Sequence, residues 1–97
     1  MAAATRIGDA DVPHCSSMVR AQGSPNVRVN GRGWSRVGDL NSSHLVPGGV
    51  ECAGHAAAIT QGSSSVRING RAAGRVGDPI AGCTAVAEGS PDVFCGG

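Results

Sequence analysis

Aromatic residues are nearly absent from this chain of 97 residues, which has one Trp, one Phe and no Tyr. The apolar residues are mostly Ala and Val, and 16 residues are Gly, whose conformational entropy is the most costly to lose on folding. A fully buried Val contributes roughly 1.5–3 kcal/mol, and ordering each residue costs about as much. The core is therefore thin, and the chain needs a metal, disulfides or a partner chain for stability.

Lysine is also absent, and eight Arg against seven acidic residues leave a net charge of +1. This balance predicts no strong attraction to nucleic acid or to a membrane. The opening Met-Ala-Ala-Ala-Thr-Arg lacks the apolar core of a signal peptide, and no stretch is long enough to span a membrane. We therefore expect synthesis in a reducing cytoplasm, where cysteines serve as ligands or buried thiols rather than as disulfides.

What the chain does contain is an internal repeat. Residues 22–39 return as residues 61–78 with 12 of 18 positions identical, where unrelated sequences share about one. Each copy has alternating apolar residues around an Asn-Gly pair, which is the strongest short-range signal of a β-hairpin because both turn positions favour positive φ. Each copy has a return strand, residues 32–37 in the first, and ends in Arg-x-Gly-Asp. This ending predicts a tight corner whose carboxylate accepts hydrogen bonds from backbone N–H groups.

Half-copies near the two ends of the chain complete a third unit. The closing Arg-x-Gly-Asp elements begin at Arg6, Arg36 and Arg75, and the opening Gly-Ser elements begin at Gly23, Gly62 and Gly89. We therefore expect the two chain ends to lie side by side, and residues 1–97 to form one domain with pseudo-threefold symmetry. Segments 45–60 and 79–88 are Gly- and Ala-rich connections, with at most a short helix around 56–60.

A residue that can bind metal follows each corner, five positions after its Asp. These residues are His14, His44 and Cys83. Under threefold symmetry they meet near the axis, and His55 is the best candidate for a fourth ligand, with Cys52 as the alternative. Zn²⁺ binds imidazole and thiolate together, and a site with four protein ligands is structural rather than catalytic. We expect one structural Zn²⁺ per chain, whose binding offsets the thin core.

The other cysteines have simpler explanations. Cys15 is adjacent to His14, and adjacent side chains of an extended chain point to opposite faces, so it packs elsewhere. Cys95 lies in a strand-like tail and is expected to be a small buried thiol. A Ser-His-Asp triad is disfavoured because the chain has no nucleophile elbow and little room for a substrate cleft. Two alternatives stay open: a small secreted or periplasmic binding module with two disulfides, and a zinc hydrolase with three protein ligands.

The segment Val66-Arg-Ile-Asn-Gly-Arg-Ala-Ala-Gly-Arg-Val-Gly-Asp78 and its earlier copy resemble the PAAR-repeat family, the tip proteins of type VI secretion spikes and related contractile phage tails. The resemblance implies an all-β, cone-shaped, pseudo-threefold arrangement of short β-hairpins with Gly-rich loops, stapled by zinc at the tip. The family's ligands are three His and one Cys. Carried onto this sequence, they are His14, His44, His55 and Cys83.

The same resemblance implies a function and partners. The chain would be a non-enzymatic structural protein that caps and sharpens a trimeric β-helical spike, one tip per trimer, and so helps a contractile machine to pierce a membrane. It would also be a docking base for secreted effectors, with no nucleic-acid partner and no stable membrane insertion. Such a protein is cytoplasmic before assembly and is delivered outside the cell or into a target cell without a signal peptide, unless it is part of a phage tail.

Overall fold

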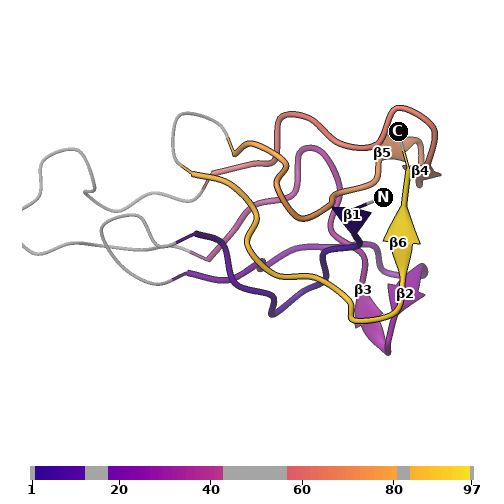
Figure 1. The fold of residues 1–97 in the computed structure, drawn as a ribbon, viewed down its shortest axis with the longest axis horizontal. Helices are drawn as coiled ribbons and strands as arrows, with labels where there is room; N and C mark the ends of the chain where they lie inside the picture. Colours follow the sequence, from indigo (N-terminus) through magenta and orange to yellow (C-terminus); the bar gives the residue numbers. More distant parts are fainter. Residues whose placement is uncertain (1, 13–17, 43–56, 81–83, 97) are drawn as a thin grey trace, which may run out of the picture.

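The computed structural model describes residues 2–12, 18–42, 57–80 and 84–96, whose regular elements are very short strands (Figure 1). The strands are β1 (Ala2–Ala3), β2 (Arg28–Val29), β3 (Arg32–Gly33), β4 (Arg67–Ile68), β5 (Arg71–Ala72) and β6 (Phe94–Cys95). They form three antiparallel pairs, β2 with β3, β4 with β5 and β1 with β6. This confirms the all-β prediction. In the described ranges, no helix is long and apolar enough to cross a membrane.

The two Asn-Gly turns form as predicted. Asn30 and Gly31 have φ values of 52° and 80°, and Asn69 and Gly70 have values of 56° and 81°. Positive φ at both central residues gives the turn the twist that matches the right-handed twist of its flanking strands. The local sequence therefore decides where β2 returns as β3 and where β4 returns as β5.

The third pair joins the two ends of the chain, as expected. Ala2 pairs with Cys95 and Ala3 pairs with Phe94. Figure 1 shows both ends beside the other two hairpins, at the same end of the molecule. The register also aligns the units, since Cys95 holds the position that Val29 and Ile68 hold in the complete hairpins.

A closed ring of backbone hydrogen bonds joins the three units. Ser35 N donates to Thr5 O at 3.0 Å, Thr5 N donates to Gly74 O at 3.2 Å, and Gly74 N donates to Ser35 O at 2.8 Å. The bridges beside the ring follow the same order, with Arg6 opposite Trp34, Arg36 opposite Ala73 and Arg75 opposite Ala4. Each unit thus pairs with the next and the last with the first, which is the pairing that pseudo-threefold symmetry requires.

Two local predictions were less accurate. The return strand expected over 32–37 stays with its hairpin only through Gly33, and Ser35 then pairs with Thr5 of a neighbouring unit. The sequence allows at most a short helix around 56–60, and none forms over residues 57–60, the described part of that range, because these residues run extended beside neighbouring segments. Ile59 N donates to Asp39 O at 3.3 Å, and Ile59 O accepts from Gly38 N at 3.0 Å. In both places contacts between units override the local pattern.

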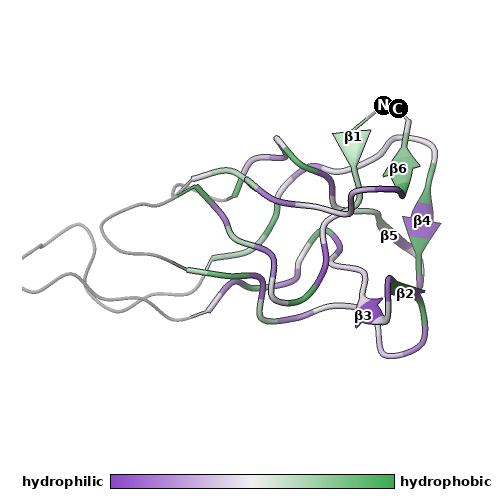
Figure 2. Ribbon diagram, turned by 60° about the horizontal axis from the view of Figure 1, so that its bottom comes forward, coloured by the Kyte–Doolittle hydropathy of each residue, from purple (hydrophilic) through white to green (hydrophobic). Residues whose placement is uncertain are grey.

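The core is divided into two small clusters, as the composition suggests. One lies under the hairpins and consists of Ala4, Val29, Trp34, Ile68, Ala73 and Cys95. The other consists of Ala57, Ile59, Ile80 and Val86. The Trp34 indole N–H donates to Gly74 O at 2.9 Å, so its polar atom is satisfied inside the first cluster. Figure 2 shows that the surface strands differ in polarity, with β1 and β6 apolar and β3 hydrophilic.

Candidate functional site

Each Arg-x-Gly-Asp element forms the predicted corner. The backbone N–H of its Arg donates to the Asp carboxylate three residues later, at 2.8, 2.9 and 2.7 Å in the three units. The intervening glycines, Gly8, Gly38 and Gly77, have φ values of 94°, 92° and 93°. Glycine adopts this left-handed region without the steric cost that other residues meet there. The repeated tripeptide x-Gly-Asp is therefore a structural corner.

The Arg side chain returns to the same carboxylate. In the first unit, Arg6 Nε donates to Asp9 Oδ2 and Arg6 Nη2 donates to Asp9 Oδ1, both at 2.8 Å. These bonds raise the pKa of Arg6, and the pKa values of Arg36 and Arg75 are raised in the same way. Burial alone raises the pKa of Asp9, but the hydrogen bonds from Arg6, with the charges of Arg6 and Arg32, together lower that pKa overall. Because bidentate charged pairs are strong and directional, the pair of Arg and Asp holds each corner in a fixed conformation.

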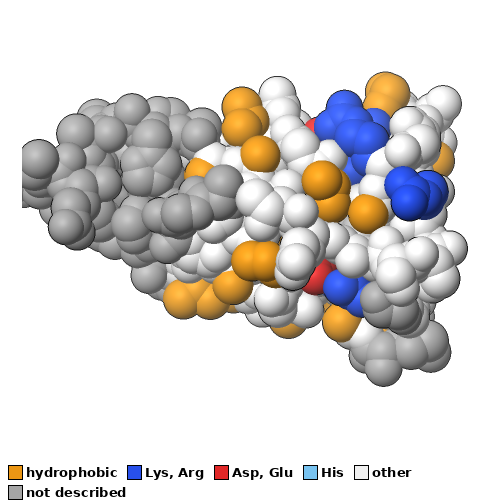
Figure 3. All heavy atoms as spheres, turned by 90° about the horizontal axis from the view of Figure 1, so that it is seen from above, with side chains coloured by type: hydrophobic (Ala, Val, Ile, Leu, Met, Phe, Trp, Pro, Cys, Tyr) orange, Lys and Arg blue, Asp and Glu red, His pale blue; other side chains and the backbone are white. Residues whose placement is uncertain are grey.

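A second Arg connects two of the corners to a neighbouring hairpin. Arg32 lies 3.3 Å from the Asp9 carboxylate, and Arg71 lies 3.1 Å from that of Asp39. Their side chains are 42% and 45% exposed, whereas each carboxylate is 3% exposed. Such half-exposed pairs contribute little stability. They do place guanidinium groups on the surface near the hairpins, where Figure 3 shows Arg side chains.

The predicted ligands His14, His44, His55 and Cys83 lie outside the described residues, as do Cys15 and Cys52. Among the residues that are described, no group of three or more His, Cys, Asp or Glu could hold a metal ion. The described residues next to the undescribed ranges bond to one another. Ser42 N donates to Val19 O at 2.7 Å, and Val12 N donates to Ala85 O at 2.8 Å. The described residues that flank these ranges therefore lie at the end of the molecule opposite the hairpins (Figure 1).

Cys95 is a free, buried thiol, as expected from its place in the strand-like tail. Its side chain packs in the hairpin cluster, where Val29 and Ile68 hold the equivalent positions. Burial raises the pKa of the thiol, because the thiolate would lose its hydration. The residue therefore acts as a small apolar side chain.

The sequence analysis did not predict the role of three buried serine hydroxyls. Ser24, Ser63 and Ser90 follow the opening glycines, and each hydroxyl accepts the N–H groups two and three residues later, at 2.8–3.2 Å. The signal was present, because the Gly-Ser pair occurs in all three units. A Ser hydroxyl can replace a backbone partner in this way. These serines set the start of each hairpin.

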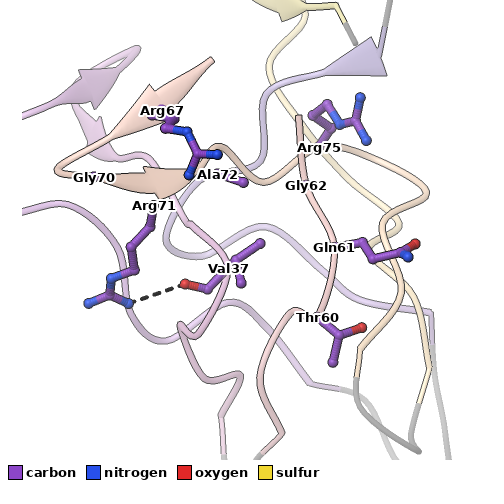
Figure 4. Close-up of a pocket in the computed structure, with 9 residues that line it drawn as sticks. All are labelled: Val37, Thr60, Gln61, Gly62, Arg67, Gly70, Arg71, Ala72 and Arg75. Atoms are coloured by element: carbon purple, nitrogen blue, oxygen red, sulfur yellow. Dashed lines mark hydrogen bonds between the residues drawn. The ribbon is translucent and has the colours of Figure 1, made fainter. Parts of the chain in front are cut away.

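A groove of about 630 Å³ lies beside β4 and β5 (Figure 4). It is lined by Val37, Thr60, Gln61, Gly62, Arg67, Gly70, Arg71, Ala72 and Arg75. Of these lining residues, three are Arg and none is acidic. The groove was not predicted, because it lies between two units of the repeat and depends on how they pack.

Comparison with known protein families identifies a match in the second half of the chain. Residues 49–97, just over half of the chain, match the family model described as the PAAR motif. The match covers the second full copy of the repeat and the tail that supplies β6. No match was found among curated proteins.

Proposed function

Because the chain belongs to the PAAR-motif family, we propose that it caps and sharpens the trimeric β-helical spike of a contractile injection machine, of a type VI secretion system or a phage tail. The family is structural and has its role at spike tips, in association with spike proteins. The observation that carries the proposal is the hydrogen-bonded ring of Thr5, Ser35 and Gly74. Through this ring one chain offers three similar sides, as a trimeric partner requires.

The hairpin end suits such a partner. Each of its three strand pairs has only two strands in the described ranges, so each leaves backbone groups along an outer edge. A trimeric β-helix also ends in three strand edges, and unpaired edges are sites of unwanted association. If the strands of the two proteins pair at all three edges, the exposed backbone N–H and C=O groups of both become hydrogen-bonded. We place the spike contact at this end.

We further propose that the opposite end holds one structural Zn²⁺ per chain through His14, His44, His55 and Cys83, with Cys52 as the alternative to His55. Imidazole and thiolate donors suit zinc. The proposal is supported by the position of the described residues that flank the ligand-bearing ranges, which lie together at this end. It is also supported by the small size of the two apolar clusters. When bound, the metal supplies a rigid point that packing of such small side chains does not.

Localisation and cargo follow from the same role. The chain would be cytoplasmic before assembly and then delivered outside the cell or into a target, where the sharpened tip aids membrane piercing. Secreted effectors would dock on it. The alternative with two disulfides is not supported, because Cys95 is a free buried thiol and only three other cysteines are present.

The decisive experiment is co-expression with the trimeric spike protein of the same injection machine, followed by native mass spectrometry. We expect one copy of this chain for each spike trimer. A spike protein truncated before the end of its β-helix is the control and should not bind. Absence of a complex, or three copies per trimer, would contradict the proposal.

A further inference from the structure

The groove beside β4 and β5 has a threefold-related counterpart that serves as an internal comparison. The counterpart has a volume of about 320 Å³ and is lined by Ile7, Ala21, Gln22, Gly23, Arg36, Asp39 and Arg71. Gln22, Gly23 and Arg36 are the equivalents of Gln61, Gly62 and Arg75 in the larger groove. The counterpart includes the Asp39 carboxylate, whereas the larger groove has only basic and neutral lining residues. The larger groove also includes Arg67, whereas the equivalent Arg28 is not among the residues that line the counterpart.

The first difference between the grooves lies at Gln61. In the other two units, the side chains of Gln22 and Glu88 accept the backbone N–H of Leu40 and Ala10, at 3.0 and 2.8 Å. The equivalent residue beside Gln61 is Pro79, which has no N–H to donate. Within the described part of the chain, the Gln61 amide has no hydrogen-bond partner. Figure 4 shows this amide at the groove.

The second difference lies at Arg75. In the other two corners, Nη1 of Arg6 and Nη1 of Arg36 donate to the side chains of Asn30 and Asn69, at 2.9 and 3.0 Å. The equivalent of these asparagines in the third unit is Gly96, which has no side chain. Arg75 binds Asp78 through Nε and Nη2, and its Nη1 has no acceptor among the described residues. Its side chain is 18% exposed, compared with 9% for Arg6.

Two more guanidinium groups border the groove. Arg67 is exposed on β4 and has no hydrogen-bond or ion-pair partner in the described ranges. Arg71 is held by the Asp39 carboxylate at 3.1 Å and by Val37 O at 3.3 Å. The groove thus combines one fixed cation with donors on Gln61, Arg67 and Arg75. Planar guanidinium forks match the geometry of a carboxylate, which they bind through two parallel hydrogen bonds.

We propose that this groove binds the carboxylate side chains of an acidic segment of a partner protein, with Arg67, Arg75 and Gln61 as the donors. Nucleic acid is disfavoured, because the groove has no aromatic side chain on which a base could stack and the chain has a net charge of only +1. The corner arginine of the counterpart, Arg36, is fully bonded to Asp39 and Asn69, so we expect the partner to bind once per chain, at the larger groove. That this partner is a protein carried by the injection machine rests on the proposed function, whereas the carboxylate site itself does not.

The test is titration of the full chain with an acidic peptide rich in Asp and Glu, followed by calorimetry and by NMR of the Arg side-chain N–H groups. A peptide with Asn and Gln at the same positions is the first control. We expect the acidic peptide alone to bind and to shift the Arg67 and Arg75 signals. Arg67→Gln should weaken binding about tenfold, the effect of losing one strong charged contact. Gln61→Ala should weaken it less.

Arg28→Gln is the matched control, because Arg28 holds the position in β2 that Arg67 holds in β4. This variant should bind the acidic peptide as the natural chain does. Equal losses in the two Arg variants would indicate unspecific charge attraction and overturn the proposal. Equal binding of the neutral peptide, no binding of the acidic one, or preferential binding of a DNA duplex or of inorganic phosphate would also overturn it.

The spike complex separates this site from the proposed function. Gln61→Ala changes a residue outside the hairpin strands, so it should still form the complex with one chain per spike trimer while binding the acidic peptide more weakly. If the natural chain binds the peptide but not the spike protein, the carboxylate site is supported and the proposed function at the spike tip is contradicted. If Gln61→Ala abolishes the spike complex, the groove belongs to the spike interface and the inference of a separate partner is wrong.

Discussion

Arg20 and Asp11 form an ion pair 3.0 Å long in which both side chains are completely buried. The pair breaks the symmetry of the molecule, because Ile59 and Val86 hold the position of Arg20 in the other two units. The same place in the fold thus accepts either a charged pair or aliphatic side chains. Burying two charges costs several kcal/mol per ion, which mutual attraction repays only in good geometry.

Removal of one member of this pair should be far worse than replacement of both. Arg20→Val alone leaves the Asp11 carboxylate buried without its cation, and we expect a loss of about 3–5 kcal/mol. The double variant Arg20→Val with Asp11→Ile copies the third unit, which has Val86 and Ile80 at these positions. It should be close to neutral or more stable. Urea denaturation gives the free energy of unfolding of both variants. A double variant as unstable as the single one would contradict the explanation.

Cys95 should be replaceable by an apolar residue and not by a polar one. Since Val29 holds the equivalent position, Cys95→Val should keep or increase the free energy of unfolding. Cys95→Ser should lower it by about 1–3 kcal/mol, the cost of a poorly satisfied buried hydroxyl. Because burial raises the pKa of the thiol, labelling of the Cys95 peptide, followed by mass spectrometry, should be slow until denaturant is added. Rapid labelling of the folded chain would contradict this.

The corner at Asp9 predicts a loss of stability in acid. Burial opposes ionisation of Asp9, but the hydrogen bonds from Arg6 and the charges of Arg6 and Arg32 together hold its pKa below the ordinary 3.8. The unfolded chain therefore takes up the proton first as the pH falls. This contribution is fully present above the ordinary pKa and is lost as the pH falls through the lower, folded value. In Asp9→Asn, the free energy of unfolding should depend less on pH in this range. An unchanged pH dependence would mean that another group causes the loss of stability in acid.

Zinc removal should have a structural effect. We expect about one zinc per purified chain, and unfolding when a strong chelator removes it, because zinc sites of this type are coupled to folding. His44→Ala and Cys83→Ala should reduce the zinc content measured by elemental analysis. Cys15→Ala is the control and should keep the metal. Equal effects of the three variants, or a fold that survives without metal, would contradict the ligand set.

The predictable features of the fold are those that repeat. The turns at Asn30-Gly31 and Asn69-Gly70, the Gly-Asp corners and the pairing of the chain ends all follow from local patterns that occur more than once. The buried pair of Arg20 and Asp11 occurs once, and so does Pro79 beside Gln61, so no repeat revealed them. The crossing of the segment after Gly33 to another unit depends on packing between units. The metal ligands lie outside the described residues and stay a prediction.

The pairing of β1 with β6 has a consequence for the order of events during synthesis. β1 is synthesised more than ninety residues before its partner β6. Until then a nascent chain can build two complete hairpins and must leave the third side open. Closure of the ring is therefore a late, long-range step, which is slow because distant parts of the chain must first meet.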